Sequence, residues 1–314
     1  HSNLSPEAQK LLVCLAPFSG FVFRLGMANY VQQLQQLEAF AGYEFEQLDG
    51  AIQEAIHWGL LSPISLTPNP SPINGRGGQD DERFLLIQPV LPYFLQVKAK
   101  ELDEATQIAL SEGFKNHYRG LGSYYNRLME SKEPQERQLG IAFCRWEYEN
   151  LYKALRVCLE TQESIDIFFC LDKYFELIND VRSNLELAEF VCQTQAAYPN
   201  EIRTGRIGFH LVMSLDRLAA CYLMTQNYLE ARESYQKIIG LLEQLTGVEE
   251  TQIESAKAST YHQLGIVAQE LREWEQARSH YQQALAIFIE YNDRYSQAST
   301  YHQLGIVAQE LREW

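Results

Sequence analysis

The side chains that most often carry catalysis or hold metals are thinly spread through this sequence of 314 residues. No histidine lies in an H-E-x-x-H pattern, and neither a G-x-S-x-G nor a G-x-x-x-x-G-K-[ST] motif occurs. The segment NGRGGQDD (74–81) is rich in glycine, but it lacks the lysine and the following serine or threonine of a phosphate-binding loop. We therefore expect no enzymatic activity, no cofactor and no metal in this chain. The seven histidines are His1, His57, His117, His210, His262, His280 and His302.

The six cysteines are widely separated, and each stands among apolar residues with helical spacing. This pattern favours buried free thiols over disulfides or metal ligands, and therefore a reducing, cytoplasmic environment. No apolar run is long enough to span a membrane, and the N-terminus HSNLSPEAQK lacks the basic and apolar parts of a signal peptide. The cysteines are Cys14, Cys144, Cys158, Cys170, Cys192 and Cys221.

The charge balance argues against a nucleic-acid partner. The formal net charge is −15, so the chain repels phosphate backbones unless cations gather locally. The expected helix at 47–58 would be the one to read DNA, but it carries Asp49 and Glu54 and no lysine or arginine. Recognition helices need cations for contacts with phosphates and guanine. We therefore expect no nucleic-acid partner.

A segment of seventeen residues, ASTYHQLGIVAQELREW, occurs twice, at 258–274 and at 298–314. From 261 to 291, apolar and small residues fall at helical spacing on two faces separated by a turn, which predicts a helix–turn–helix unit. Small residues on these faces would let the two helices approach closely. The first face is Tyr261, Leu264, Ala268 and Leu271, and the second is Ala277, Tyr281, Ala284, Leu285 and Phe288.

A weaker copy precedes this unit, displaced by 46 residues instead of 40. The segment LTGVEETQIESA (245–256) is expected to be a linker that absorbs the difference. Residues 208–314 therefore read as two full helix pairs and one unpaired first helix, and we expect an array of which this chain is a part. The copy is carried by Leu218, Ala219, Tyr222, Tyr228, Ala231 and Tyr235.

The pattern of this unit resembles the tetratricopeptide repeat, although the period of 40 exceeds the usual 34. The matching positions are Tyr261, Leu264, Gly265, Ala268, Ala277, Tyr281 and Ala284. The resemblance implies that the first helix of each pair lines a concave surface that binds a protein or peptide. The inward positions that it implies are Ser259, His262, Ile266, Gln269 and Glu270, their copies Ser299, His302, Ile306, Gln309 and Glu310, and Met213, Asp216, Ala220, Leu223 and Met224 in the weaker repeat.

These inward positions are neutral to acidic with an apolar strip. The cations with which some repeats of this kind hold a C-terminal carboxylate are absent, so a basic or apolar peptide is the expected ligand. The alternative is that the same residues form a solvated helix face without any ligand.

The last helix, 298–314, has no following helix to cover it. Its apolar side carries Tyr301, Leu304, Ala308 and Leu311. Because each unit of a solenoid is stabilised by its neighbours, we expect this end to stack on another molecule, including a second copy, or to fray.

The first hundred residues follow a different plan. Helices are predicted at 5–18, 27–40 and 46–61, followed by two short strands at 60–66 and 83–89. The segment between the strands, 67–82, is rich in proline and glycine and is expected to be an exposed loop. Three helices and a hairpin are the order of a winged helix. Residues 101–200 are predicted to be helical without a clean repeat.

This order of parts resembles the C-terminal half of STAND-class signalling NTPases of the NB-ARC type. Residues 146–155 are similar to the E-x-x-N-L-x-x-A-L segment of that group, at Glu147, Asn150, Leu151, Ala154 and Leu155. The resemblance implies a sensor and regulatory region that recognises proteins. A transcription regulator of similar architecture and a free-standing scaffold are the alternatives.

The predicted fold class is all-α with a small β-wing, a winged helix followed by a right-handed α-solenoid. The predicted domains are 1–98, winged-helix-like; 99–204, a divergent helical region that resembles tetratricopeptide repeats; and 205–314, the repeat array with an unpaired last helix.

Overall fold

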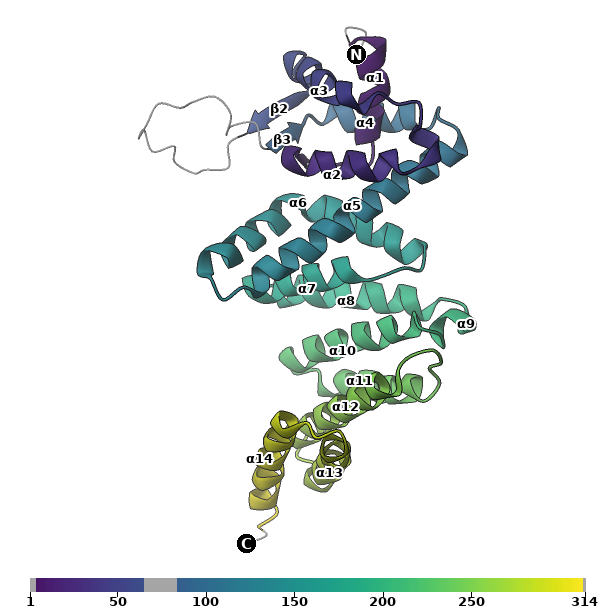
Figure 1. The fold of residues 1–314 in the computed structure, drawn as a ribbon. Helices are drawn as coiled ribbons and strands as arrows, with labels where there is room; N and C mark the ends of the chain where they lie inside the picture. The colour runs from purple at the N-terminus through teal and green to yellow at the C-terminus, as the bar shows by residue number, and fades with distance from the viewer. Residues whose placement is uncertain (1–3, 65–83, 313–314) are drawn as a thin grey trace, which may run out of the picture. The chain divides into compact units, whose positions relative to one another are not determined.

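The computed structural model describes residues 4–64 and 84–312, so the predicted loop at 67–82 lies outside the described residues. The chain is mostly helical with one small sheet, and helix pairs form a solenoid in its C-terminal part, which confirms the predicted fold class (Figure 1). Contacts group the chain into two compact units. The first holds residues 1–160 and 166–174, and the second holds residues 161–165 and 175–314. The finer division into three domains stays a prediction.

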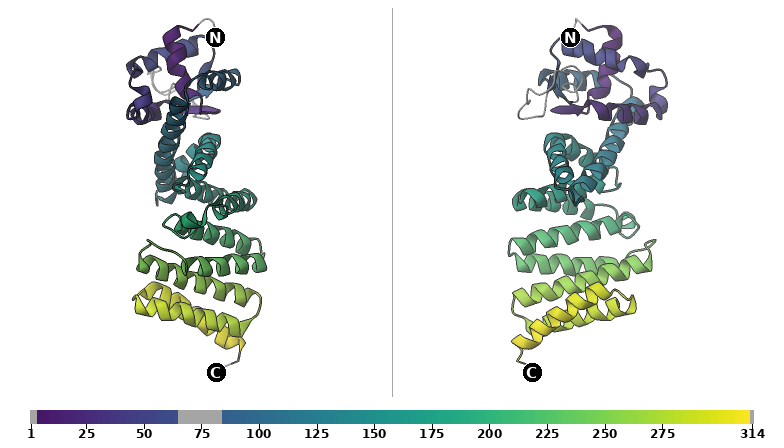
Figure 2. Two further views of the ribbon diagram at one scale, coloured as in Figure 1. Left: turned by 90° about the vertical axis from the view of Figure 1, so that its right-hand side faces the viewer. Right: turned by 60° about the vertical axis from the view of Figure 1, so that its left-hand side comes forward.

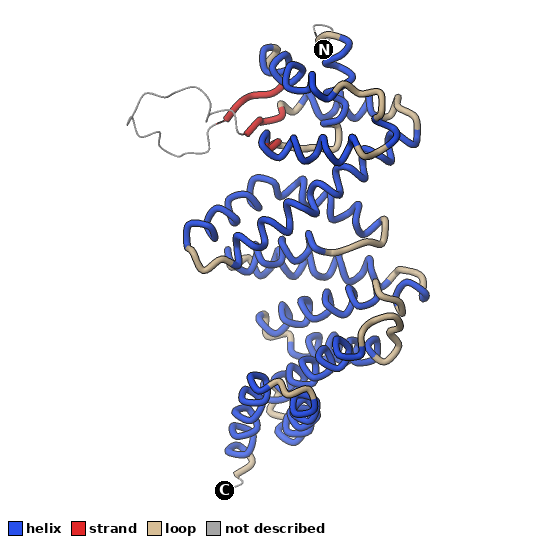
Figure 3. Tube along the Cα trace, in the orientation of Figure 1, coloured by secondary structure: helices blue, strands red, loops and turns tan. Residues whose placement is uncertain are grey.

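The first unit begins with helices around a three-stranded antiparallel sheet, drawn in red in Figure 3. Strand β3 is central, and its side chains at Phe84, Leu85 and Ile87 are buried. The three predicted helices and the predicted pair of strands are present, but the short strand β1 was not predicted. The elements are α1 (Pro6–Leu12), β1 (Phe21–Phe23), α2 (Arg24–Gln35), α3 (Leu48–His57), β2 (Leu61–Ile64), β3 (Phe84–Ile87) and α4 (Val90–Ala99), with 3-10 turns at Val13–Leu15, Glu38–Phe40 and Phe45–Gln47.

Long helices follow, α5 (Glu104–Glu130) and α6 (Pro134–Glu160), and then α7 (Asp166–Ile178). Helix α5 starts where the Asp103 carboxylate accepts a hydrogen bond from the Thr106 backbone N–H at 2.9 Å. The apolar positions of α5 and α6 recur with helical spacing and are buried against each other. They provide the frame against which the N-terminal elements pack.

The E-x-x-N-L-x-x-A-L segment of α6 fastens these N-terminal elements to the long helices. The Asn150 side chain accepts a hydrogen bond from the Ser19 backbone N–H at 2.7 Å and donates one to the Phe21 carbonyl oxygen at 3.0 Å. Its amide also donates to the Glu147 carboxylate at 2.8 Å, which accepts a second hydrogen bond from the Tyr118 hydroxyl at 2.7 Å. Both Glu147 and Asn150 are fully buried. These bonds fix the start of β1 on α6.

The second unit is a stack of helices joined by short turns (Figure 2). The predicted two full helix pairs are α10 with α11 and α12 with α13, and α14 is the unpaired first helix. The segment 245–256 was predicted to be a linker, but α12 already begins at Glu250. The second half of the segment is therefore the first part of α12, and only its residues 245–249 lie between α11 and α12. The helices are α8 (Val181–Ala196), α9 (Asn200–Arg203), α10 (Gly208–Met224), α11 (Tyr228–Leu242), α12 (Glu250–Glu270), α13 (Trp274–Glu290) and α14 (Arg294–Glu310).

The turns inside the helix pairs share one backbone conformation. Asn179, Gln226 and Arg272 have φ values of 57°, 60° and 59°, in the left-handed region. At each turn the next backbone N–H returns to the last helical turn, as in the bond from Glu273 to the Ala268 carbonyl oxygen at 2.8 Å. At Gln226 and Arg272 the chain reverses within two residues, and the second helix of the pair lies directly on the first.

The two identical segments occupy different surroundings. In α12, Gly265 is buried so tightly that an added Cβ would lie 2.5 Å from the Tyr281 ring of α13. In α14 the equivalent Gly305 is exposed, and a Cβ there would meet nothing within 4 Å. Leu264 is buried, whereas Leu304 is only half-buried. The second helix of the pair, α13, therefore accounts for the greater burial of Leu264 and Gly265 in α12.

We predict that Gly265→Ala destabilises the α12–α13 pair, whereas Gly305→Ala does not destabilise α14. Alanine favours helix over glycine by about 1 kcal/mol at both positions. At Gly265 this gain is outweighed by overpacking against a rigid buried ring, which typically costs about 1–3 kcal/mol. The rate of backbone hydrogen exchange in α13 measures the change in stability, and its fragments can be assigned because the sequence of α13 occurs only once. Equal effects of the two substitutions would show that the close approach does not hold the pair together.

We also predict that the stability of the first unit falls as pH rises. Burial raises the pKa of Glu147 from 4.5 to about 7, against the lowering effect of the Asn150 and Tyr118 hydrogen bonds. Because the folded-state pKa lies above the unfolded one, the stabilisation by the protonated form is complete below about pH 4.5 and is lost as pH passes through about 7. Between these limits, the free energy of unfolding should fall by up to about 3 kcal/mol relative to Glu147→Gln.

Urea unfolding at several pH values measures this difference. The exposed Glu133→Gln is the matched control and should keep the pH dependence of the wild type. Parallel pH curves for the wild type and Glu147→Gln would refute the assignment.

Candidate protein-binding surfaces

The five inward positions predicted on α12 lie in different surroundings. Ser259 is exposed and lines an open hollow of about 440 Å³ between α10 and α12. The other lining residues are Phe209, Thr251, Gln252, Ser255 and Ala256. Ser259 therefore faces a hollow between two first helices of the array.

His262 connects one helix pair to the next. Its Nδ1 lies 3.0 Å from the Thr300 hydroxyl oxygen of α14. That hydroxyl donates its proton to the Ser296 carbonyl oxygen at 2.7 Å, so Nδ1 is the donor and Thr300 accepts. Burial lowers the pKa of His262, and its ring lies 5.4 Å from the Tyr281 ring. The residue is engaged in packing between helices.

The remaining positions of α12 also have partners within the chain. Ile266 packs against the buried cluster that includes Tyr281 and Val307. Gln269 accepts a hydrogen bond from the Tyr281 hydroxyl at 3.1 Å, and the exposed Glu270 accepts one from the Tyr228 hydroxyl at 3.2 Å. These side chains, which were predicted to contact a ligand, therefore contact neighbouring helices of the chain.

The equivalent positions elsewhere are more exposed. On α14, Ser299, His302, Gln309 and Glu310 are exposed and Ile306 is half-buried. On α10, Asp216 forms an ion pair with Arg217 at 2.8 Å, Met213, Ala220 and Leu223 are half-buried, and Met224 is exposed. A binding role for these residues stays a prediction.

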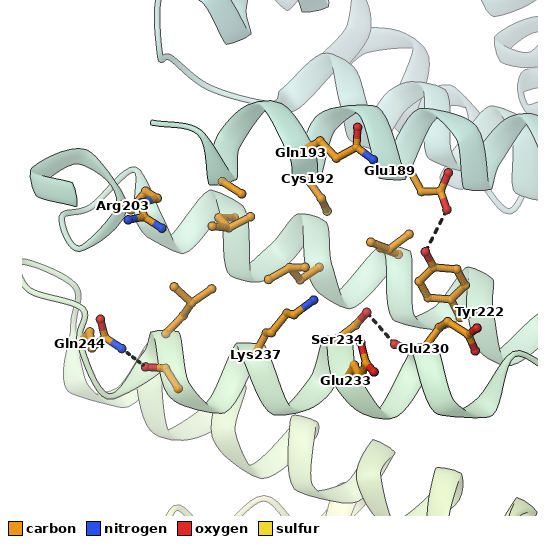
Figure 4. Close-up of a pocket in the computed structure, with 16 residues that line it drawn as sticks. Glu189, Cys192, Gln193, Arg203, Tyr222, Glu230, Glu233, Ser234, Lys237 and Gln244 are labelled. Carbon is orange, nitrogen blue, oxygen red and sulfur yellow. Dashed lines mark hydrogen bonds between the residues drawn. The ribbon is translucent and has the colours of Figure 1, made fainter. Parts of the chain in front are cut away.

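A larger pocket that the sequence analysis did not predict lies between α8, α10 and α11 (Figure 4). Its volume is about 560 Å³, within the range of sites for small molecules or single side chains. The floor is apolar and comes from Leu211, Leu215 and Leu218 of α10 with Cys192 and Ala196 of α8. The polar lining residues are Glu189, Gln193, Arg203, Tyr222, Glu230, Glu233, Ser234, Lys237 and Gln244.

The polar groups divide between the two ends of this pocket. Tyr222 donates a hydrogen bond to the Glu189 carboxylate at 2.9 Å, with Glu230 beside it, while Arg203 lies at the other end (Figure 4). Burial and the Glu189 carboxylate raise the pKa of Tyr222 to about 12. Lys237 lies between the ends. The pocket therefore offers an acidic end, a basic end and an apolar floor.

Small side chains open this pocket. Ser234 and Gly240 of α11 and Ala196 of α8 line it, and a Cβ at Gly240 would meet nothing within 4 Å. Burial raises the pKa of the Cys192 thiol to about 12, so the thiol stays protonated and is not a nucleophile at neutral pH. The signal in the sequence is this coincidence of small residues on two helices, which becomes visible only when their spatial pairing is known.

Within residues 4–64 and 84–312, no group of three or more His, Cys, Asp or Glu side chains is placed to hold a metal ion. No helix of the same ranges has the length and apolar character needed to cross a membrane.

The comparison with protein families gives one match, in which residues 257–314 fit the tetratricopeptide repeat. This match covers α13, α14 and most of α12. No curated protein is similar enough to count as a match.

Several solved structures are similar to parts of the chain. BtubC (BKLC) from P. vanneervenii is 16% identical, over 65% of this chain and 82% of that one, with a TM-score of 0.44. The apo form of RapI is also 16% identical, over 72% and 66%, with a TM-score of 0.42. A STAND protein with a tetratricopeptide repeat sensor from Pyrococcus horikoshii is 12% identical, over 97% of this chain and 54% of that one, with a TM-score of 0.34. These values are too low to transfer a function.

Proposed function

We propose that the second unit recognises a peptide segment of a protein partner, and that the pocket between α8, α10 and α11 is its anchor site. The apolar floor of this pocket is the observation that carries the proposal, because a cavity of about 560 Å³ has room for an apolar anchor side chain and for part of the peptide beside it. Tetratricopeptide repeats bind proteins or peptides, and residues 257–314 of this unit match that family.

The charges of the rim define the peptide further. Glu189, Glu230 and Glu233 outnumber Lys237 and Arg203 among the lining residues. A lysine or arginine next to the apolar anchor would meet the acidic end of the pocket, close to Tyr222. The favoured ligand is therefore an apolar residue flanked by a basic one, in agreement with the basic or apolar peptide expected from the sequence.

We predict that a random peptide library selected on the full chain yields peptides with this pattern, and that Gly240→Leu abolishes their binding. The leucine would occupy part of the pocket, in competition with an anchor side chain, and its Cβ would meet no atom within 4 Å. It also replaces a helical glycine, so folding should be retained or improved, by up to about 1 kcal/mol. Calorimetry with a selected peptide measures the loss.

Gly120→Leu is the matched control, because Gly120 is also helical with open space around it but lies in the first unit. Binding should survive this change. If the selected peptides bind Gly240→Leu as well as the wild type, the anchor lies elsewhere, and the hollow beside Ser259 becomes the site to test.

We further propose that the chain is the sensor and regulatory region of a cytoplasmic STAND-type signalling protein. The support is the order of its parts and the hydrogen bonds by which Asn150 joins β1 to α6 at the matching segment. A winged-helix role for the N-terminal elements is part of this proposal. The gene on both sides of this sequence provides the test: a phosphate-binding loop encoded upstream is expected, and a frame without any NTPase module would contradict it.

The apolar side of α14 is proposed as a second interaction surface, and its occupant is a helix with the pattern of α13. The support is the identity of residues 258–274 and 298–314, since α12 already binds such a helix with the same side chains. Tyr301 is 55% exposed, and Leu304 and Leu311 are only partly covered. Self-association through α14 would use this same surface.

We predict that a synthetic peptide of residues 274–290 protects α14 from hydrogen exchange. The affinity should be weak, because an isolated helix of this length is largely unfolded in water. In the exchange measurement, proteolytic fragments that begin within residues 291–297 can be assigned to α14, because these residues precede the segment that α14 shares with α12. A peptide with Ala284→Glu is the control and should give no protection, since Ala284 is fully buried in the α12–α13 pair. Protection by both peptides, or by neither, would exclude this occupant.

A further inference from the structure

A second cavity, of about 420 Å³, lies within the first unit where α4, α5 and α6 meet the segment that follows α1. Its lining residues come from four separate stretches of the chain. They are Ala16, Pro17, Gln96, Ala99, Lys100, Gln107, Leu110, Ser111, Phe114, Lys153, Arg156, Val157 and Glu160. No motif of the sequence points to this cavity, which exists only because the fold brings these stretches together.

The charge of this cavity is opposite to that of the chain. Lys100, Lys153 and Arg156 line it with a single acidic residue, Glu160, whereas the whole chain carries a formal charge of −15. Glu160 compensates Arg156 only weakly, because their closest nitrogen and oxygen atoms are 3.9 Å apart and both side chains are more than half exposed. Salt screens distant charges beyond about 8 Å at physiological ionic strength, so the local cations dominate the potential in the cavity.

Lys153 is held in place by the fold. Its ammonium group donates hydrogen bonds to the Pro17 carbonyl oxygen at 2.8 Å and to the Ser19 hydroxyl at 2.9 Å. An ammonium group has three donors, so one proton remains for a third acceptor. Burial lowers the pKa of Lys153, and the nearby Glu149 opposes this shift. The cation is therefore oriented before any ligand arrives.

Apolar residues form the rest of the lining. Leu110 and Phe114 of α5 are buried, and Ala16 and Pro17 face them from the segment after α1. A site of this composition suits a ligand with a compact apolar body and a single anionic group.

We propose that this cavity binds an amphipathic organic anion, with its apolar body against Leu110 and Phe114 and its carboxylate or phosphate near Lys100, Lys153 and Arg156. The proposal is independent of peptide recognition by the second unit. It assigns a small-molecule site to the part of the chain that holds the N-terminal elements on α6.

Calorimetry on the full chain with four probes tests the proposal. Octanoate and phenyl phosphate carry both features, whereas inorganic phosphate lacks the apolar body and 1-octanol lacks the charge. Octanoate, phenyl phosphate or both should bind more tightly than inorganic phosphate and 1-octanol, and this binding should weaken as salt is added. The stronger of the two anions identifies the head group as carboxylate or phosphate.

The variant Lys100→Gln with Arg156→Gln should weaken binding of the better probe by roughly tenfold, since two partly exposed charges are lost. Lys132→Gln with Arg145→Gln removes the same charge from exposed positions outside the cavity and should change nothing. Both variants keep Lys153, whose hydrogen bonds are structural. Failure of both anions to bind, equal binding of 1-octanol, or equal effects of the two variants would each overturn the proposal.

Discussion

The approach of Gly265 to the Tyr281 ring is the constraint on which the α12–α13 pair depends. Only a residue without a side chain lets the α12 backbone come within contact of a fully buried aromatic ring. The same ring then contacts His262 and donates its hydroxyl proton to Gln269. One aromatic side chain thereby fixes the distance between two helices and the orientation of the polar residues beside it. In the α10–α11 pair the corresponding residues are Ala219 and Tyr235, both fully buried, so a small residue facing a buried tyrosine is what the two pairs share.

The turns make the contact possible at short range. A left-handed residue at 226 or 272 lets the chain reverse in two residues, so the second helix starts in contact with the first. Neither of these residues is glycine, and the backbone conformation therefore costs about 1 kcal/mol at each turn. The packing of the buried faces must offset that cost. The sequence predicted the turn before Ala277 from the break between two apolar faces, and not from the left-handed residue itself, because arginine and glutamine are ordinary surface residues elsewhere.

The sequence predicted the helix pairs best where small and aromatic residues alternate at helical spacing, as at Ala277 and Tyr281. It predicted residues 101–200 as divergent, repeat-like helices without a clean repeat. The left-handed residues Asn179 and Gln226 mark equivalent turns and lie 47 positions apart. With this displacement, Ala188 of α8 is equivalent to the buried Tyr235 of α11. The aromatic marker is missing there, so the repeat could not be seen. Likewise β1 is too short for its alternation to be recognised, and its position depends on hydrogen bonds from Asn150, more than a hundred residues away.

Binding sites in this chain arise where packing is incomplete, and that is why single positions did not predict them. Inward positions of α12 were chosen from a helical pattern, but His262, Ile266 and Gln269 contact other helices of the stack. The pocket beside α10 is open because Ser234, Gly240 and Ala196 are small on helices that face each other. An aromatic residue opposite a glycine closes an interface, whereas small residues opposite one another leave a cavity whose floor is the apolar face beneath. Recognition surfaces in such an array are therefore properties of pairs of helices, and a sequence pattern read along one helix does not contain them.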